Sequence, residues 1–507
     1  MTAVTNREDG LSSEARSLLA RRRERALNML RGKLHHHDAP SIPVARDTRP
    51  APLSGNQRWL WNFHRVKPDT WNHVVQHLVK GPLNVAALEQ SLAEIIRRHG
   101  SLRTTFPVVG GEPVQLVSPF RASTVPLADL RGETARRRQE EVRRAAAELC
   151  EVRFDLADGP LVRSALLRLG EDEHVLLLAV PHIIADGWSV GVCMEEFRAL
   201  YEAFRDGRPS PLPELPIQFA DFASWEQRWL QSEEARAQLD YWKRQLEGTS
   251  APDFCAAVTP TGFKPERTYA LATRSLSVGR DLTAKIREMN QRERVTLFMT
   301  VMSALMTTLH QLTGQEKLCV STASANRTHE ETKRLIGFFS NVLAIGADFS
   351  GDPTWRELQG RVRETILGAY EHQSLPLTAL AEAVRPDYDF RSIFPLHRVV
   401  CSLDETRSAA AAQAELTGAP SSSGLEWGQP PGGDKAYLSE EGQIDRDLVL
   451  QIQEGPEDIT LNLLVDRGLF DRAALDAMLP HLLVLLRSMA DEPERQLSDF
   501  PPIQARP

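Results

Sequence analysis

Hydrophobic and polar residues alternate along the chain in a way that predicts both strands and helices in its first half. A continuous apolar run over 175–180 is typical of a buried strand, and the pattern over His73–Val79 suggests another. A helix is predicted after Asn84, with Gly100 as its stop. Its apolar residues recur on one face: Val85, Leu88, Leu92, Ile95 and Ile96.

The second half of the chain repeats this mixture of elements. An apolar helix is predicted over Leu297–Leu312, with Thr296 as its N-cap and Gly314 as its stop. The other predicted elements are a strand at Lys317–Ser324, a strand pair at Asp447–Ile452 and Ile459–Val465, and a closing helix from Arg472. Two comparable halves predict an α/β (α+β) fold of two lobes, over residues 53–258 and 259–507.

Residues 1–52 precede the two lobes. The segment over 11–34 reads as a basic amphipathic helix, which either docks a partner or lies solvated against the main body. Residues 35–37 are three consecutive histidines, which we interpret as a polar stretch because they cannot all face one metal from regular structure. A proline-punctuated linker follows. Residues 409–433 are rich in Ala, Ser, Gly and Pro with few strand formers, and predict a mobile loop.

Composition narrows the class of protein. Hydrophobic residues make up 42% and charged residues 25%, and no run approaches the roughly 18 apolar residues of a membrane span, so a soluble globular protein is expected. A net charge of −8 with interspersed signs gives no support to nucleic-acid binding. The five cysteines lack metal-type spacing and no signal-peptide core is present, so we expect a cytoplasmic protein without a membrane partner.

The strongest candidate for chemistry is the stretch V-P-H-I-I-A-D-G-W-S, residues 180–189. His182 follows the buried strand, and Asp186 and Gly187 come shortly after it. A histidine held on a tight turn at the edge of a cavity suits a general base. A hydrogen-bonded core histidine is the alternative reading of the same spacing.

This stretch resembles H-H-x-x-x-D-G, the motif of condensation domains of nonribosomal peptide synthetases, except that Pro181 replaces the first histidine. Further motifs of that family match in the same order. They are L-S-G-N-Q-R-W-L-W at 53–61, R-H-G-S-L-R-T-T-F at 98–106, A-N-R at 325–327 and I-G-F-F-S-N-V-L at 336–343. The resemblance runs from about Leu53 to Pro501.

The resemblance implies two lobes like chloramphenicol acetyltransferase, arranged as a V-shaped pseudo-dimer around a central channel. Donor and acceptor would arrive on the phosphopantetheine arms of peptidyl carrier proteins, or the acceptor would be a free small molecule. No cofactor would be permanently bound, and no metal is expected. The implied function is condensation in antibiotic and other secondary metabolism: an acyl or aminoacyl thioester is transferred to an amine, giving an amide, or to a hydroxyl, giving an ester.

The same resemblance assigns roles to individual residues. His182 would be the base or positioning group, and Gly187 would let the pantetheine arm pass close to the backbone. Asp186 would fix the turn through a salt bridge, for which Arg103 is the first candidate.

Three further residues have structural or channel-lining roles in this interpretation. Trp188 and Pro181 belong to the same turn, and Asn341 stands where the family has a residue near the channel. A buried Asn341 could equally be a satisfied core amide.

Pro181 leaves a second function open: a catalytically impaired module that binds carrier proteins or recruits partners. We favour the enzyme because the histidine, the aspartate and the glycine are all present. Related types with D-x-x-x-x-D or H-R-x-x-x-D-E at this place do not fit residues 181–187.

Overall fold

The computed structural model describes residues 41–44, 50–66, 71–121, 124–150, 153–254, 265–384, 395–403, 425–428, 446–500 and 503. The helix predicted over 11–34, the histidines at 35–37 and most of the loop predicted over 409–433 lie outside these ranges.

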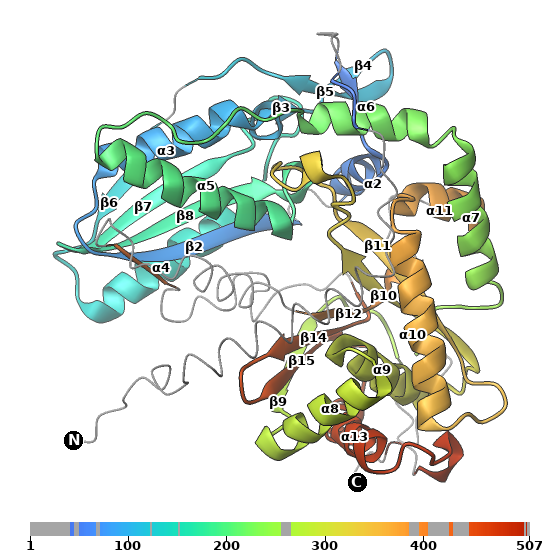
Figure 1. The fold of residues 1–507 in the computed structure, drawn as a ribbon. Helices are drawn as coiled ribbons and strands as arrows, with labels where there is room; N and C mark the ends of the chain where they lie inside the picture. The colour runs from blue at the N-terminus through green and yellow to red at the C-terminus, as the bar shows by residue number, and fades with distance from the viewer. Residues whose placement is uncertain are drawn as a thin grey trace, which may run out of the picture.

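The first lobe is built on a five-stranded sheet with the order β13-β2-β8-β7-β6 (Figure 1). Its strands are β2 (Asn72–Lys80), β6 (Leu127–Asp129), β7 (Arg163–Gly170), β8 (Glu173–Pro181) and β13 (Glu426–Gly428). Helices cover both faces: α3 (Val85–Arg98) and α5 (Gly187–Arg205) pack on one, and α4 (Ala135–Cys150) packs on the other.

The apolar run of β8 explains its central position. Alternate residues of a strand point to opposite faces, so a strand that is apolar at every position must be buried on both sides. Leu176 packs in the cluster that contains α3 and α5, whereas Val175 and Leu177 pack against α4. The strands predicted at 175–180 and His73–Val79 are therefore confirmed, and they pair with each other in antiparallel fashion.

Strand β13 corrects part of the loop prediction. Glu426–Gly428 pairs antiparallel with β2, which extends the first lobe's sheet with a segment from the second half of the chain. Trp427 packs edge-on against Phe197 and Tyr201 of α5. The burial of this one large side chain holds a strand that its local composition does not predict.

The second lobe has a six-stranded sheet with the order β11-β10-β12-β14-β15-β9. Its strands are β9 (Leu271–Ser277), β10 (Lys317–Ser324), β11 (Asn341–Asp348), β12 (Val399–Leu403), β14 (Leu448–Glu454) and β15 (Ile459–Asp466). Its helices include α8 (Arg280–Glu293), α9 (Leu297–Thr313), α10 (Trp355–Glu371) and α13 (Arg472–Asp491). The predicted pair of strands near 450 and 460 is confirmed as β14 and β15.

Helix α9 is the central helix of this lobe and has the predicted ends. The Thr296 side chain accepts a hydrogen bond from the Met299 N–H, and Gly314 ends the helix with φ 69°. An unbranched glycine adopts that left-handed conformation without a steric penalty. Every residue from Met299 to Leu309 is buried, as expected of a helix that is apolar on all sides.

Helix α13, and the bent pair α8 and α9 taken together, have the length and hydropathy of a membrane span. Core helices of globular proteins can share these properties. Leu475, Leu479, Leu482 and Leu486 of α13 lie in the core cluster of the second lobe, where they pack with residues of α9.

The lobes meet where α2 (Gly55–His64), α6 (Phe219–Trp229) and α11 (Leu377–Val384) lie together (Figure 1). A small sheet of β1 (Ala51–Pro52), β3 (Thr104–Thr105), β4 (Val108–Val109) and β5 (Glu112–Val117) lies nearby. Trp242 of α7 (Glu233–Gln245) belongs to the core of the second lobe. The division of the chain near residue 258 stays a prediction.

Candidate functional site

The predicted histidine turn forms the junction between β8 and α5. Strand β8 ends at Pro181, residues His182–Ile184 make one turn of 3₁₀-helix, and α5 begins directly after Asp186. The His182 N–H donates to the Trp71 carbonyl oxygen at 2.8 Å, which fastens the turn to the start of β2.

Pro181 fits the end of its strand. Its φ of −71° is close to the value that the pyrrolidine ring imposes. Successive N–H groups of a strand point to opposite edges, and the His182 N–H points to the β2 side. The missing N–H of Pro181 would therefore point toward β7, where the pairing with β8 has already ended at Ala179. Among the described strands, no ladder hydrogen bond is lost.

The imidazole of His182 is held in one tautomer. Its Nδ1 lies 2.7 Å from the Ala185 carbonyl oxygen. A carbonyl oxygen can only accept, so Nδ1 carries the proton and Nε2 carries the lone pair. Within the described part of the chain no group hydrogen-bonds to Nε2, which leaves this nitrogen to accept a proton.

Three other rings surround this imidazole. Trp71 stacks on it at 5.6 Å between ring centroids, Phe338 lies at 4.6 Å, and His73 meets it edge-on at 4.2 Å. A cavity of about 10 Å³ beside Pro181 and His182 has about the volume that one water molecule requires. Burial lowers the pKa of His182 from its usual value, so the ring is neutral at neutral pH.

Trp71 is in a conformation that is rare for a large side chain. Its φ of 67° lies in the left-handed region, and the guanidinium of Arg446 lies over its ring at 4.9 Å. Such backbone conformations cost about 1–3 kcal/mol and persist where the surroundings fix them. Here the hydrogen bond from His182, the stacking on His182 and the cation–π contact from the second lobe hold Trp71 in place.

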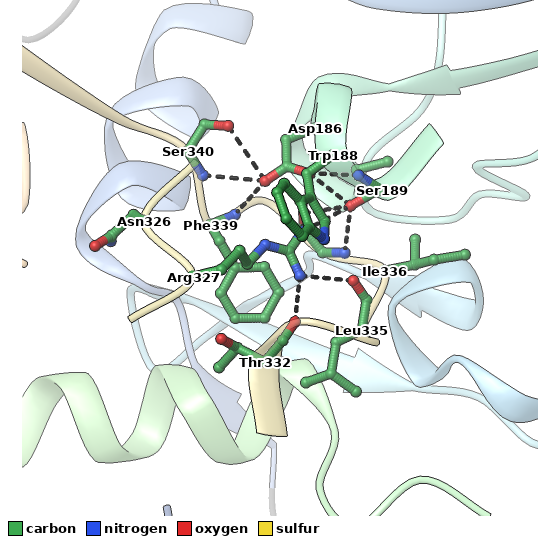
Figure 2. A network of polar contacts seen from close by, with 12 residues as sticks. Asp186, Trp188, Ser189, Asn326, Arg327, Thr332, Leu335, Ile336, Phe339 and Ser340 are labelled. Carbon is green, nitrogen blue, oxygen red and sulfur yellow. Dashed lines mark hydrogen bonds and ion pairs between the residues drawn. The ribbon is translucent and has the colours of Figure 1, made fainter. Parts of the chain in front are cut away.

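Asp186 is fully buried and caps the first turn of α5. Its Oδ1 accepts from the backbone N–H of Ser189 at 2.9 Å, from the Ser189 hydroxyl at 2.7 Å and from Arg327 at 2.9 Å. Its Oδ2 accepts from the N–H groups of Phe339 and Ser340 at 3.1 Å and from the Ser340 hydroxyl at 3.2 Å (Figure 2). Burial opposes ionisation, but the Arg327 charge and the Ser189 bonds outweigh it and lower the pKa of Asp186.

Arg327 is the salt-bridge partner of Asp186, so the expectation that Arg103 would fill this role is wrong. Arg103 instead lies at the C-terminal end of α3, where its Nε donates to the Ile96 carbonyl at 3.0 Å. There it satisfies carbonyl groups that the helix leaves open. Arg327 extends across to the turn from the second lobe, and Figure 2 shows its guanidinium also bonded to the carbonyls of Thr332 and Leu335.

The segment from Leu335 to Ser340 completes the turn from the second lobe. The Ser189 hydroxyl donates to the Gly337 carbonyl at 2.9 Å, and the Ser101 hydroxyl donates to the Ile336 carbonyl at 2.7 Å. The Trp188 indole donates to the Lys333 carbonyl at 2.9 Å. Trp188 thus joins the start of α5 to the second lobe.

Gly187 and Asn341 occupy opposite kinds of environment. Gly187 is exposed at the first position of α5, and a Cβ atom added there would meet no described atom within 4 Å. Asn341 is buried, and its amide is satisfied by Asn56, Leu377 and the carbonyls of Gln373 and Leu375. Of the two readings of Asn341, the structure supports the core amide.

Five residues of the site have no role that the sequence predicts: Trp71, His73, Phe338, Ser189 and Arg327. The match of A-N-R at 325–327 is a signal for Arg327, but it names no partner. His73 stands at the start of a predicted strand, and no sequence signal places it against His182.

Comparison with known proteins gives one family. A family model described as the condensation domain matches residues 48–504. Linear gramicidin synthase of Brevibacillus parabrevis has a polypeptide that is 35% identical over 472 residues, which are 92% of this chain and 9% of that protein. Phosphinothricin tripeptide synthetase PhsC of Streptomyces viridochromogenes is 30% identical over 91% of this chain and 41% of its own length. The chain therefore spans less than half of each of these two relatives.

Solved structures have the same fold. The X-domain from teicoplanin biosynthesis matches with a TM-score of 0.76 and 25% identity, over 91% of this chain and all of that one. The condensation domain of the Monacolin K polyketide synthase MokA matches with a TM-score of 0.72 and 20% identity, over 89% of this chain and 99% of that one. The predicted mixed α/β fold is confirmed.

Proposed function

The chain belongs to the condensation domain family, and from this we propose that it transfers a carrier-bound acyl or aminoacyl group to an acceptor amine, with an acceptor hydroxyl as the less frequent case. The product is an amide or an ester. Its relatives among peptide synthetases support this reaction and a role in secondary metabolism. We propose a cytoplasmic location, where the thioester donors are made.

One observation carries the proposal: the fixed tautomer of His182. With Nδ1–H bonded to the Ala185 carbonyl and the ring neutral, Nε2 can accept a proton at neutral pH. The acceptor nitrogen attacks the thioester carbon, Nε2 takes the proton that the nitrogen loses, and the C–S bond breaks. The departing pantetheine thiolate then receives that proton, which returns His182 to its neutral state.

Alignment contributes the rest of the rate in this proposal. A thioester is already a good electrophile, and holding two reactants in line replaces a bimolecular encounter with a unimolecular step. Asp186 supports this indirectly, because its hydrogen bonds to both lobes hold the turn that carries His182. The open space at Gly187 leaves room for a pantetheine arm beside the backbone.

Carrier proteins are the proposed partners. The donor arrives on the phosphopantetheine of one peptidyl carrier protein, and the acceptor arrives on another or as a free small molecule. Phosphopantetheine is thus part of the substrate and is not a resident cofactor.

The test is a reconstituted transfer. A peptidyl carrier protein loaded with a panel of acyl groups is offered to the full chain together with amines, alcohols and acceptor-loaded carriers, and products are identified by mass. A new amide or ester that depends on the protein and disappears with His182→Gln supports the proposal. Hydrolysis alone, or product formation that His182→Gln leaves unchanged, contradicts it.

A carrier-binding or partner-recruiting module is the second candidate. Pro181 favours it, as does the similarity to the teicoplanin X-domain, which also has a solved structure in complex with OxyB. Saturable carrier binding without turnover on any acceptor would decide for this module. Turnover decides for the enzyme.

A further inference from the structure

His73 places a second imidazole directly against His182. It is the second residue of β2 and lies opposite Val180 in the antiparallel register with β8. Its ring meets that of His182 at 4.2 Å between centroids and at 74°, the shortest ring contact that His182 makes within the described chain. The contact joins the reactive turn to the strand beside it.

This contact acts on the one rotation that His182 could still make. Turning the imidazole by about 180° around its Cβ–Cγ bond exchanges Nδ1 with a carbon, and terminal torsions of this type have two broad minima. The exchange would break the bond to the Ala185 carbonyl and would turn Nε2 away from its present position. Trp71 and Phe338 lie against the ring as well, and His73 adds an edge-to-face contact.

His73 is suited to this task because it stays neutral. Burial first, and the charge of a protonated His182 second, lower the pKa of His73 to about 3, with Asp186 opposing them. Two protonated imidazoles at this distance would repel each other. His73 can therefore remain in contact while His182 gains and loses a proton.

We propose that His73 is a positioning residue for His182: its ring, delivered by β2, keeps the His182 imidazole in the orientation in which Nδ1 bonds to Ala185 and Nε2 is open to substrate. This inference rests on the proposed function for its effect on turnover, but its effect on the His182 tautomer does not. The catalytic turn then draws one of its supports from a strand more than 100 residues earlier in the chain.

Kinetics provide the first test. His73→Ala is expected to lower kcat by about 10- to 100-fold, the scale of a small misplacement of a reacting group, without a matching rise in KM for the loaded carrier. His73→Phe, which retains a planar ring, is expected to keep most of kcat. His77→Ala is the matched control, because His77 lies on the same face of β2 and contacts Trp427 in place of His182.

Imidazole ¹⁵N spectra of the histidine-labelled full chain provide the second test, with His182 assigned by the loss of its signals in His182→Gln. Wild type, His73→Phe and His77→Ala are expected to show a protonated Nδ1 and an unprotonated Nε2 at His182. His73→Ala is expected to show averaging between the two tautomers. If His73→Ala does not fold, His73→Val takes its place, since valine is favoured in strands.

The outcomes separate the two proposals. An unchanged His182 tautomer together with unchanged kcat in folded His73→Ala overturns the positioning role, and so does a loss of kcat in His73→Phe as large as in His73→Ala. A tautomer that changes in His73→Ala while wild type turns over no substrate supports the positioning role and refutes the proposed enzyme.

Discussion

Asp186 and Arg327 stand 141 residues apart in the sequence and form an ion pair of 2.9 Å that joins the two lobes. Both side chains are almost completely withdrawn from solvent. The pair gives the reactive turn a fixed position relative to the second lobe, because Asp186 caps α5 while Arg327 bonds to carbonyls of its own lobe.

Replacing Asp186 tests this pair through stability. Asp186→Ala leaves a buried guanidinium without its counter-charge and several N–H groups without an acceptor, which is expected to cost about 3–5 kcal/mol. Denaturant unfolding of the full chain measures the change. Asp129→Ala, which removes an exposed acid paired with Arg131, is the control and should stay close to wild type. Equal midpoints for the two variants would refute the importance of the buried pair.

His182→Ala should remove the proton acceptor and leave the fold intact. General acid–base catalysis contributes about 10²- to 10⁴-fold, so single-turnover transfer from a loaded carrier is expected to slow by that factor. Thermal unfolding of the same preparation checks the fold. Wild-type rates in this variant would make His182 a bystander.

Pro181→His restores the first histidine of the family motif. We expect turnover to change far less than in His182→Ala, because Pro181 has a suitable φ and its missing N–H would face an edge where pairing has ended. Both variants and wild type are compared on one loaded carrier. If the histidine confers activity on an inert wild type, the recruiting module is the better description.

Gly187 is expected to tolerate added atoms in folding but not in turnover. A Cβ there meets no described atom within 4 Å, so Gly187→Leu should unfold like wild type. If a pantetheine arm passes beside it, kcat/KM for the loaded carrier should fall by about 100-fold, the effect of displacing a substrate by about 1 Å. Gly360→Leu on α10 has the same open space around its Cβ and serves as the control. Equal kcat/KM in both variants would exclude passage at Gly187.

Glu226 on α6 should make stability fall as pH rises. Burial raises its pKa to about 7, although the Gly55 N–H donates to its Oε2 at 2.7 Å and opposes the shift. The folded protein holds this proton more tightly than the unfolded chain, whose carboxyl has a pKa near 4.5. Stability should therefore decrease between pH 4.5 and about 7, by about 3 kcal/mol.

Glu226→Gln cannot ionise and can still accept from Gly55. It is expected to flatten this part of the pH profile and to be more stable than wild type at pH 8, as measured by denaturant unfolding. Glu233→Gln, an exposed change on α7, should keep the wild-type slope. A wild-type profile without this slope would contradict the burial argument.

Local features of the sequence were sufficient for the elements whose ends and faces are set by neighbouring residues. Helix α9 begins at a threonine cap and ends at a glycine, and β8 is apolar because both of its faces are covered. The histidine turn was found in the same way, since strand, histidine and capping aspartate lie within a dozen residues.

Contacts between distant segments were beyond such reasoning. Arg103 and Arg327 are both arginines in recognised motifs, and only the folded chain shows which of them reaches Asp186. Strand β13 has no local strand signal, because its place depends on Trp427 packing against α5. The contact of His73 with His182 depends on the register of two strands.

The shared construction of the turn sets a rule for recombining condensation domains. The carboxylate of Asp186 comes from one lobe, and the N–H groups of Phe339 and Ser340 that it accepts from come from the other. A chimera joined between the lobes would combine an aspartate turn from one parent with a 327–340 segment from another. Exchanges that move both segments together preserve every hydrogen bond of Asp186, so the two segments are the natural unit of transfer between synthetases.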